Sequence, residues 1–262
     1  MNKVYEELPP IRRARDFRLY DHKGQRFVDF WQEDGSLFLG HRPESVLKQI
    51  KNELSKGLLG PLPSIWQRKL RQMLRLYFPG YHLAGLFADR ETLVKDWGMP
   101  TDPFVEATIP GTLTLWRPWT QNEKTRGPMA LLAPGVGRLG WWIVLEEGAD
   151  TSNPQSSFAQ DSFRDLVTAQ GLALLAHSQP QWEPPLVLAQ HPLLHWIGRS
   201  WFLRLPEGAN DSAVHRAFVR NGFYLPPSLK SPGFWPLQPA AQLSQGELSA
   251  FVKLLEEQPW KI

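Results

Sequence analysis

Arg13 to His41 read RARDFRLYDHKGQRFVDFWQEDGSLFLGH. Apolar and polar residues alternate over 17–20 and again over 25–30, and Asp21-His22-Lys23-Gly24 separates the two segments. Alternation on both sides of a short turn that ends in glycine predicts a β-hairpin, because Gly24 can adopt the positive φ that such turns require. Gly40-His41 then leads into a segment with helical periodicity. The residues alone therefore predict a hairpin, a loop and a helix.

The same residues resemble the N-terminal segment of class III pyridoxal-phosphate (PLP) aminotransferases, the ornithine, 4-aminobutyrate and glutamate-semialdehyde group. In that family a phrase R-A-R-G-x-x-L-x-D-x-x-G-x-x-Y-L-D-F precedes L-G-H-x-x-P. The matching residues are Arg13, Ala14, Arg15, Leu19, Asp21, Gly24, Phe27, Val28, Asp29, Phe30, Leu39, Gly40, His41 and Pro43. The resemblance implies an α/β, PLP-transferase-like (fold type I) architecture. Its small domain would be built from both chain termini, with a reduced central large domain.

Length and composition limit the classes of protein that the chain can form. Its 262 residues can bury a sizeable core, as one large domain or two unequal lobes, but are fewer than a complete class III aminotransferase has. The absence of cysteine excludes disulfides and thiolate metal sites. No apolar run approaches the length that spans a bilayer and no secretory segment follows Met1, so we expect a soluble, cytoplasmic protein with no membrane among its partners.

The charge of the chain gives only a weak indication of its partners. The net charge is +3, and basic residues gather at Arg12–Arg18 and at Arg68–Arg75. No recognition motif accompanies them, so nucleic acid is not the expected partner.

Further elements follow from periodicity and caps. We expect helices over 44–56, from Ser64 to 77, and over 158–177, and strands over 108–115, 129–132 and 141–145. After residue 200 we expect a strand over 201–205, a helix capped by Asp211 or Ser212, a strand at 223–225, and a helix opened by the capping box of Ser244 and Glu247. This last order resembles the C-terminal segment of the same family. The predicted division is 1–80 and 201–262 for the small domain with a connecting helix, and 81–200 for a large-domain remnant.

Two segments are counterparts of the family's cofactor motifs. The phosphate-binding turn S-G-T-E-A corresponds to Ala88–Thr92, which makes Asp89, Arg90, Glu91 and Thr92 the candidate phosphate-binding residues; only Glu91 matches, and Asp89 replaces the glycine. The phrase D-E-V-x-T-G-F-G-R-T-G corresponds to the segment that contains Gly135, Gly137, Arg138 and Gly140. Its aspartate, which pairs with the pyridine nitrogen in the family, falls on Ala130, and alanine cannot hold a proton on the ring.

The family's Schiff-base lysine also lacks a counterpart. No lysine occurs between Lys124 and Lys230, and Lys95 and Lys124 are the two lysines of the middle region. A PLP transaminase needs an ε-amine, so these two are the candidate catalytic residues if activity is retained. His191 and His195 are four residues apart, but Pro192 separates them and no third ligand is apparent, so no metal site is expected.

Three functions remain open from the sequence. The first is an aminotransferase-like protein without transamination, a scaffold or regulatory binding protein that binds no cofactor and forms a homodimer or a heteromer with a full-length aminotransferase. The second is an active PLP-dependent aminotransferase that uses Lys95 or Lys124. The third is a module that binds an anion or nucleic acid through its basic faces.

Overall fold

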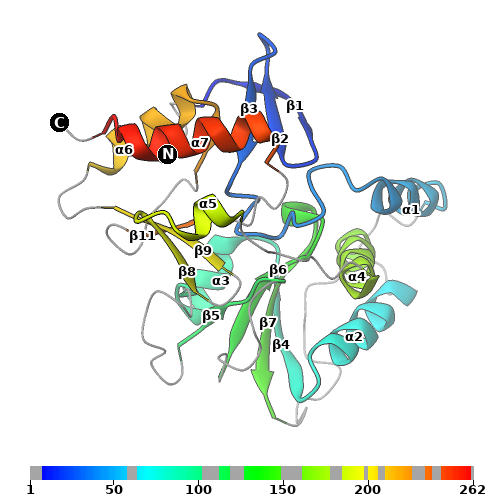
Figure 1. Cartoon of the computed structure of the whole chain (residues 1–262). Helices are drawn as coiled ribbons and strands as arrows, with labels where there is room; N and C mark the ends of the chain where they lie inside the picture. Colours follow the sequence, from blue (N-terminus) through cyan, green and yellow to red (C-terminus); the bar gives the residue numbers. More distant parts are fainter. Residues whose placement is uncertain are drawn as a thin grey trace. The chain divides into compact units, whose positions relative to one another are not determined.

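A computed structural model of the chain describes residues 8–57, 64–101, 112–118, 127–148, 161–177, 185–197, 200–205, 210–225, 234–237 and 243–260. The chain forms two compact units (Figure 1). Unit 1 takes residues 1–35, 40–42 and 181–262, and unit 2 takes residues 36–39 and 43–180. Both ends of the chain therefore build unit 1, and the central part builds unit 2.

The described part of unit 1 contains two sheets. The first has the order β1-β2-β3-β10 and comprises β1 (Ile11–Arg15), β2 (Arg18–Asp21), β3 (Arg26–Asp29) and β10 (Phe223–Tyr224). The strands β2 and β3 form the predicted antiparallel hairpin, whose turn ends at Gly24 with φ of +84°. The strand β10 pairs with β3 in parallel, so a C-terminal strand completes an N-terminal sheet.

The second sheet of unit 1 has the order β11-β9-β8. It comprises β8 (Leu194–Ile197), β9 (Ser200–Arg204) and β11 (Phe234–Leu237), and all its pairs are antiparallel. The short helix α5 (Leu186–Ala189) precedes β8, and the longer helices of this unit are α6 (Asp211–Arg220) and α7 (Gln245–Glu257). Ser244 and Glu247 form the predicted capping box at α7. The predicted cap of α6 was wrong: the side chain of Asn210, one residue earlier, accepts the Ala213 backbone amide.

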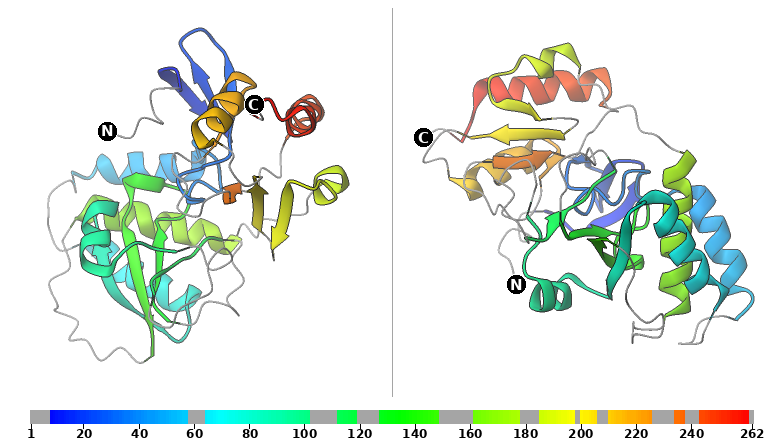
Figure 2. Two further views of the ribbon diagram at one scale, coloured as in Figure 1. Left: turned by 90° about the vertical axis from the view of Figure 1, so that its left-hand side faces the viewer. Right: turned by 90° about the horizontal axis from the view of Figure 1, so that it is seen from below.

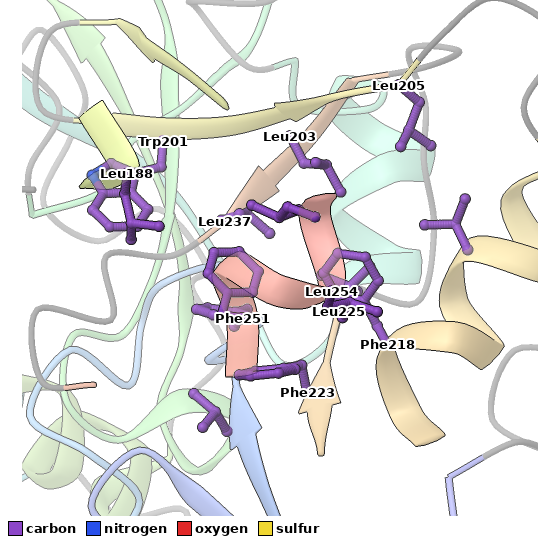
Figure 3. Packing of buried hydrophobic residues seen from close by; sticks show 14 of the residues in the cluster. Leu188, Trp201, Leu203, Leu205, Phe218, Phe223, Leu225, Leu237, Phe251 and Leu254 are labelled. Carbon is purple, nitrogen blue, oxygen red and sulfur yellow. The ribbon is translucent and has the colours of Figure 1, made fainter. Parts of the chain in front are cut away.

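Aromatic and aliphatic side chains from both chain ends form one core in unit 1 (Figure 3). The Phe223 ring lies 5.7 Å from that of Phe30 and 5.2 Å from that of Phe251. These three rings come from the segment after β3, from β10 and from α7, and each is at most 2% exposed. Because buried aromatic rings contribute large apolar areas, this contact stabilises the packing of the N-terminal segment against the C-terminal segment.

Among the residues that the structure describes in unit 2, four strands form a sheet with the order β4-β7-β6-β5. Its strands are β4 (Tyr81–Phe87), β5 (Thr114–Leu115), β6 (Met129–Leu132) and β7 (Trp142–Glu147). The strand β7 is antiparallel to both neighbours, and β5 and β6 are parallel. Every residue of β6 is buried, as expected for a strand covered on both faces. Of the predicted strand over 108–115, residues 108–111 lie outside the described ranges, residues 112 and 113 are described but not in a strand, and Thr114–Leu115 form β5.

The helices of unit 2 are α1 (Glu44–Leu54), α2 (Ile65–Tyr77), α3 (Arg90–Trp97) and α4 (Ser162–His177). Ser64 caps α2 as predicted, and its hydroxyl accepts the Trp66 amide. The helix α4 contacts both α1 and α2, and the three lie close together in Figure 2. None of the helices within the described ranges has the length and apolarity that crossing a membrane would demand.

Candidate functional site

The turn between β4 and α3 contains the four candidate phosphate-binding residues. Asp89 is the N-cap of α3: its Oδ1 accepts the Thr92 backbone amide at 2.8 Å and the Thr92 hydroxyl at 2.9 Å. These hydrogen bonds from Thr92 lower the pKa of Asp89, so the group is a carboxylate at neutral pH. Glu91 adds a second negative charge to the first helical turn, and the Arg90 guanidinium lies 5.9 Å above the Trp142 ring. The protein's own carboxylate therefore occupies the amide end of this helix.

The glycine-rich loop between β6 and β7 carries the second group of candidates. Gly135 has φ of +76° and Gly137 has φ of +56°, and Gly137 to Leu139 form the short 3₁₀ helix η3. Arg138 is exposed on η3. Glycine is required here because the backbone takes left-handed conformations that other residues seldom adopt.

The same loop packs closely against α4. A Cβ on Gly140 would overlap the Cβ of Ala133 and lie 2.7 Å from the Thr168 hydroxyl. A Cβ on Gly171, in α4, would overlap the carbonyl oxygen of Pro134. Gly140 and Gly171 thus serve helix–loop packing, and this packing explains the glycine at position 140 without any ligand.

Arg164 of α4 joins the turn and the loop. Its Nη1 donates to Gly140 O at 2.8 Å, to Ala88 O at 3.1 Å and to Arg138 O at 3.4 Å. Its Nε lies 3.3 Å from Asp161 Oδ2, and its guanidinium lies 5.4 Å from the centre of the Trp141 ring. The β4–α3 turn and the β6–β7 loop are therefore neighbours. The groups that meet between them are backbone carbonyl oxygens and the guanidinium of Arg164. Sequence reasoning missed Arg164, and nothing in its local sequence marks it.

A buried acid lies next to this arginine. Asp165 is 4% exposed, and its Oδ1 accepts Trp141 Nε1 at 2.9 Å. Burial raises the pKa of Asp165 to about 6, although the hydrogen bond from Trp141 opposes the rise. The Trp141 backbone amide donates to the Thr168 hydroxyl at 3.0 Å, so α4 holds the beginning of β7 at two points. Sequence reasoning did not single out this acid either.

Of the two candidate lysines, the structure describes only Lys95. Lys95 lies in the last turn of α3 and is exposed, and Lys124 lies outside the described residues. Unit 2 contains six lysines, and the five within the described ranges are all exposed on helices or just after one: Lys48, Lys51, Lys56, Lys69 and Lys95. Ala130, in the place of the pyridine-binding aspartate, is fully buried among aliphatic and aromatic side chains.

In unit 1 the family-like residues Asp29, Gly40 and His41 have local structural roles. Asp29 Oδ2 lies 2.9 Å from His41 Nε2, and Asp29 Oδ1 accepts the backbone amides of residues 31 and 32. Gly40 has φ of +83°, and a Cβ there would lie 2.8 Å from the backbone of Asp16. These contacts hold the segment after the hairpin against the hairpin, so this part of the motif specifies the fold.

His191 and His195 were the two histidines considered as metal ligands, and no metal site was expected at them. His191 lies just after α5, where its Nδ1 accepts the Leu193 amide at 3.2 Å, and His195 lies in β8. Burial lowers the pKa of His191. Across the described ranges, no three side chains of metal-binding type converge on one point.

Solved structures of aminotransferases share this fold. An ornithine aminotransferase from Plasmodium yoelii matches with a TM-score of 0.65 and 11% identity, over 95% of this chain and 94% of that one. Ornithine δ-aminotransferase from Plasmodium falciparum matches with a TM-score of 0.65 and 12% identity, over 97% and 94%. N-acetylornithine aminotransferase from Stenotrophomonas maltophilia matches with a TM-score of 0.61 and 12% identity, over 97% and 96%.

Proteins with detectable sequence similarity are either distantly similar over nearly the whole chain or similar over a short segment. An uncharacterized protein from Borreliella burgdorferi is 24% identical over 96% of this chain and 91% of its own length. Glutamate-1-semialdehyde 2,1-aminomutase from Clostridium acetobutylicum is 30% identical over 25% of this chain, which is 16% of the enzyme's length. No family model matches the sequence. The chain therefore has the fold of class III PLP-dependent aminotransferases (fold type I), as predicted from Arg13–Pro43 and the C-terminal segment.

The described residues of the β4–α3 turn do not fit the phosphate group of the cofactor of these enzymes. A phosphate dianion bound at a helix N-terminus needs free amide donors and no competing negative charge. In the β4–α3 turn the Asp89 carboxylate already accepts the Thr92 amide, and Glu91 is adjacent. Placing a phosphate there would bring three negative groups together, which is unfavourable without a compensating cation.

Proposed function

We propose that this chain is an aminotransferase-fold protein that does not transaminate and that acts as a scaffold or regulatory binding protein. The observation that carries the proposal is the closed β4–α3 turn, in which Asp89 caps α3 with the charge that a bound phosphate would supply. Two further features support it independently. Ala130 offers no acid to a pyridine nitrogen, and no described lysine of unit 2 is buried.

The phosphate site, the acid that pairs with the pyridine nitrogen and the lysine are three separate requirements of transamination. The absence of all three would argue against transamination more strongly than the absence of one. A relocated lysine such as Lys95 could supply an amine, but it would supply neither the phosphate site nor the acid that keeps the cofactor an electron sink. A scaffold protein that does not transaminate would act through the surface of its fold. We therefore propose that the partner is a second copy of this chain or a full-length aminotransferase of the same fold.

Covalent capture of PLP tests the proposal. Purified protein is incubated with PLP, separated from unbound and reversibly bound PLP by gel filtration, and only then reduced with borohydride and analysed by intact-mass spectrometry. We expect the unmodified mass, with an active class III aminotransferase as the positive control. A stoichiometric adduct that disappears in Lys95→Ala or Lys124→Ala, accompanied by amino transfer, would establish the active-enzyme alternative instead.

A further inference from the structure

The end of α1 and the beginning of α2 are held together by one buried acid. Lys56 Nζ donates to Glu53 Oε1 at 2.6 Å, and Trp66 Nε1 donates to Glu53 Oε2 at 3.3 Å. Only 5% of the Glu53 side chain is exposed. The hydrogen bonds from Lys56 and Trp66 keep the pKa of Glu53 low despite its burial. The two helix ends therefore have a fixed relation within unit 2.

Around this acid, each helix end presents an aliphatic side chain and cations on one face. Leu54 is 36% exposed and lies three residues after the exposed Lys51. Ile65 is 53% exposed, and the exposed Arg68 and Lys69 follow it by three and four residues. Residues three or four apart share a helix face, so the apolar and basic groups are adjacent. We call this surface the α1–α2 tip and define it as Lys51, Leu54, Lys56, Ile65, Arg68 and Lys69.

The charge of this region is unlike that of the rest of the chain. Residues 43–80 contain seven Lys and Arg against two Glu, a net charge of +5, whereas the whole chain has +3. One of those two acids is the buried Glu53. The first turn of α2 contains no acidic residue. Cations near a helix N-terminus oppose the helix dipole, so Arg68 is not explained by the stability of α2.

The positive charge and the aliphatic side chains of the α1–α2 tip indicate which class of partner could bind there. A second copy of the same face would bring like charges together, which excludes a symmetric contact of the tip with itself. Nucleic-acid phosphates would bind the cations but would leave Leu54 and Ile65 in water. A stable protein interface takes about 20–30 residues from each partner, and the tip has only six. An anionic lipid surface accepts both the cations and the aliphatic groups.

We propose that the α1–α2 tip adsorbs to the surface of an anionic membrane. Lys51, Arg68 and Lys69 lie at the level of the lipid phosphates, and Leu54 and Ile65 enter the headgroup region. The expectation that the chain avoids membranes came from the absence of a spanning segment, and surface adsorption needs none. This inference does not depend on the proposed loss of transamination.

Vesicle sedimentation tests the proposal with the full chain. Wild-type protein is expected to sediment with phosphatidylglycerol–phosphatidylcholine vesicles at low salt and to remain in solution with phosphatidylcholine alone. Lys51→Gln/Arg68→Gln/Lys69→Gln is expected to lower the partition coefficient roughly 100-fold, at about 1 kcal/mol per basic residue and about 1.4 kcal/mol per factor of ten. Leu54→Ser/Ile65→Ser is expected to weaken binding without changing the charge. Circular dichroism confirms that each variant is folded.

A matched control removes the same charge elsewhere. Arg12→Gln/Lys23→Gln/Lys253→Gln neutralises three exposed cations of unit 1 and is expected to bind vesicles as the wild type does. An equal loss in this control would mean that only net charge matters and would overturn the proposal. Absence of binding to anionic vesicles would do the same, and binding of a single-stranded RNA oligonucleotide in its place would assign the surface to nucleic acid.

Discussion

Glu247 gives the sharpest stability prediction, because it joins the two chain ends in unit 1. Its carboxylate accepts hydrogen bonds from Arg18 Nε at 2.9 Å and from Arg18 Nη2 at 2.7 Å. Arg18 lies 229 positions earlier in the sequence. Desolvation raises the pKa of Glu247, but the hydrogen bonds from Arg18 and Ser244 outweigh it and lower the pKa from 4.5 to about 2. A difference of this size corresponds to about 3 kcal/mol in favour of the ionised, folded form.

The sign of the pH dependence follows from the lowered pKa. The stabilisation by Glu247 is fully present above pH 4.5 and is lost as the pH falls toward 2. Glu247→Gln should reduce the free energy of unfolding of unit 1 by about 3 kcal/mol at pH 7, because Arg18 is left with a neutral partner in a largely buried place. The variant should also show a flatter decline in stability between pH 5 and pH 2.

Urea unfolding followed by circular dichroism, repeated across this pH range, measures both effects. Arg18→Met and the double variant complete a double-mutant cycle, which isolates the energy of the pair. Glu257→Gln removes an exposed glutamate from the same helix and should change stability by less than about 0.5 kcal/mol. If Glu247→Gln were as stable as this control and kept the wild-type pH profile, the ion pair would not fasten the chain ends.

Three predictions concern unit 2. Asp89→Ala should cost about 1 kcal/mol through loss of the cap on the Thr92 amide, and Asp89→Asn should restore most of it, as urea unfolding will show. Asp165→Asn should stabilise the unit by about 2 kcal/mol at pH 8 and little at pH 4, because the raised pKa of about 6 makes the ionised carboxylate costly while the amide oxygen can still accept from Trp141; an equal effect at both pH values in thermal unfolding would argue against a buried charge. Gly171→Ala should lower the melting temperature despite the better helix propensity of alanine, since its Cβ has no space; a higher melting temperature would show that α4 is not packed as described.

Local signals were the part of the fold that the sequence could predict. The hairpin turn at Gly24, the cap at Ser64 and the capping box at Ser244 each depend on residues within a few positions of one another, and all three are present. Asp89, which the resemblance made a candidate phosphate-binding residue, forms a cap of the same short-range kind at α3. A cap is a short-range hydrogen bond, so its residues are visible in sequence.

Edge strands and long-range contacts could not be predicted in this way. The strand β11 contains Pro236, which argues against a strand by sequence but is tolerated here at the edge of a sheet. The strand β1 reads IRRAR and lacks apolar alternation. Arg164 meets carbonyls 24 to 76 residues away, and Asp165 is buried against Trp141, 24 residues earlier. Such contacts depend on tertiary packing, and no local sequence pattern indicates them.

Phosphorus NMR of pyridoxal phosphate tests most directly whether the β4–α3 turn is closed to a phosphate group. The cofactor is titrated with the wild-type chain at neutral pH, and its phosphorus resonance is followed. Because Asp89 already holds the amide end of α3, we predict that the resonance keeps the shift and width of the free cofactor. A broadened and displaced resonance at stoichiometric protein, reproduced with inorganic phosphate and lost on Thr92→Pro, would contradict the account.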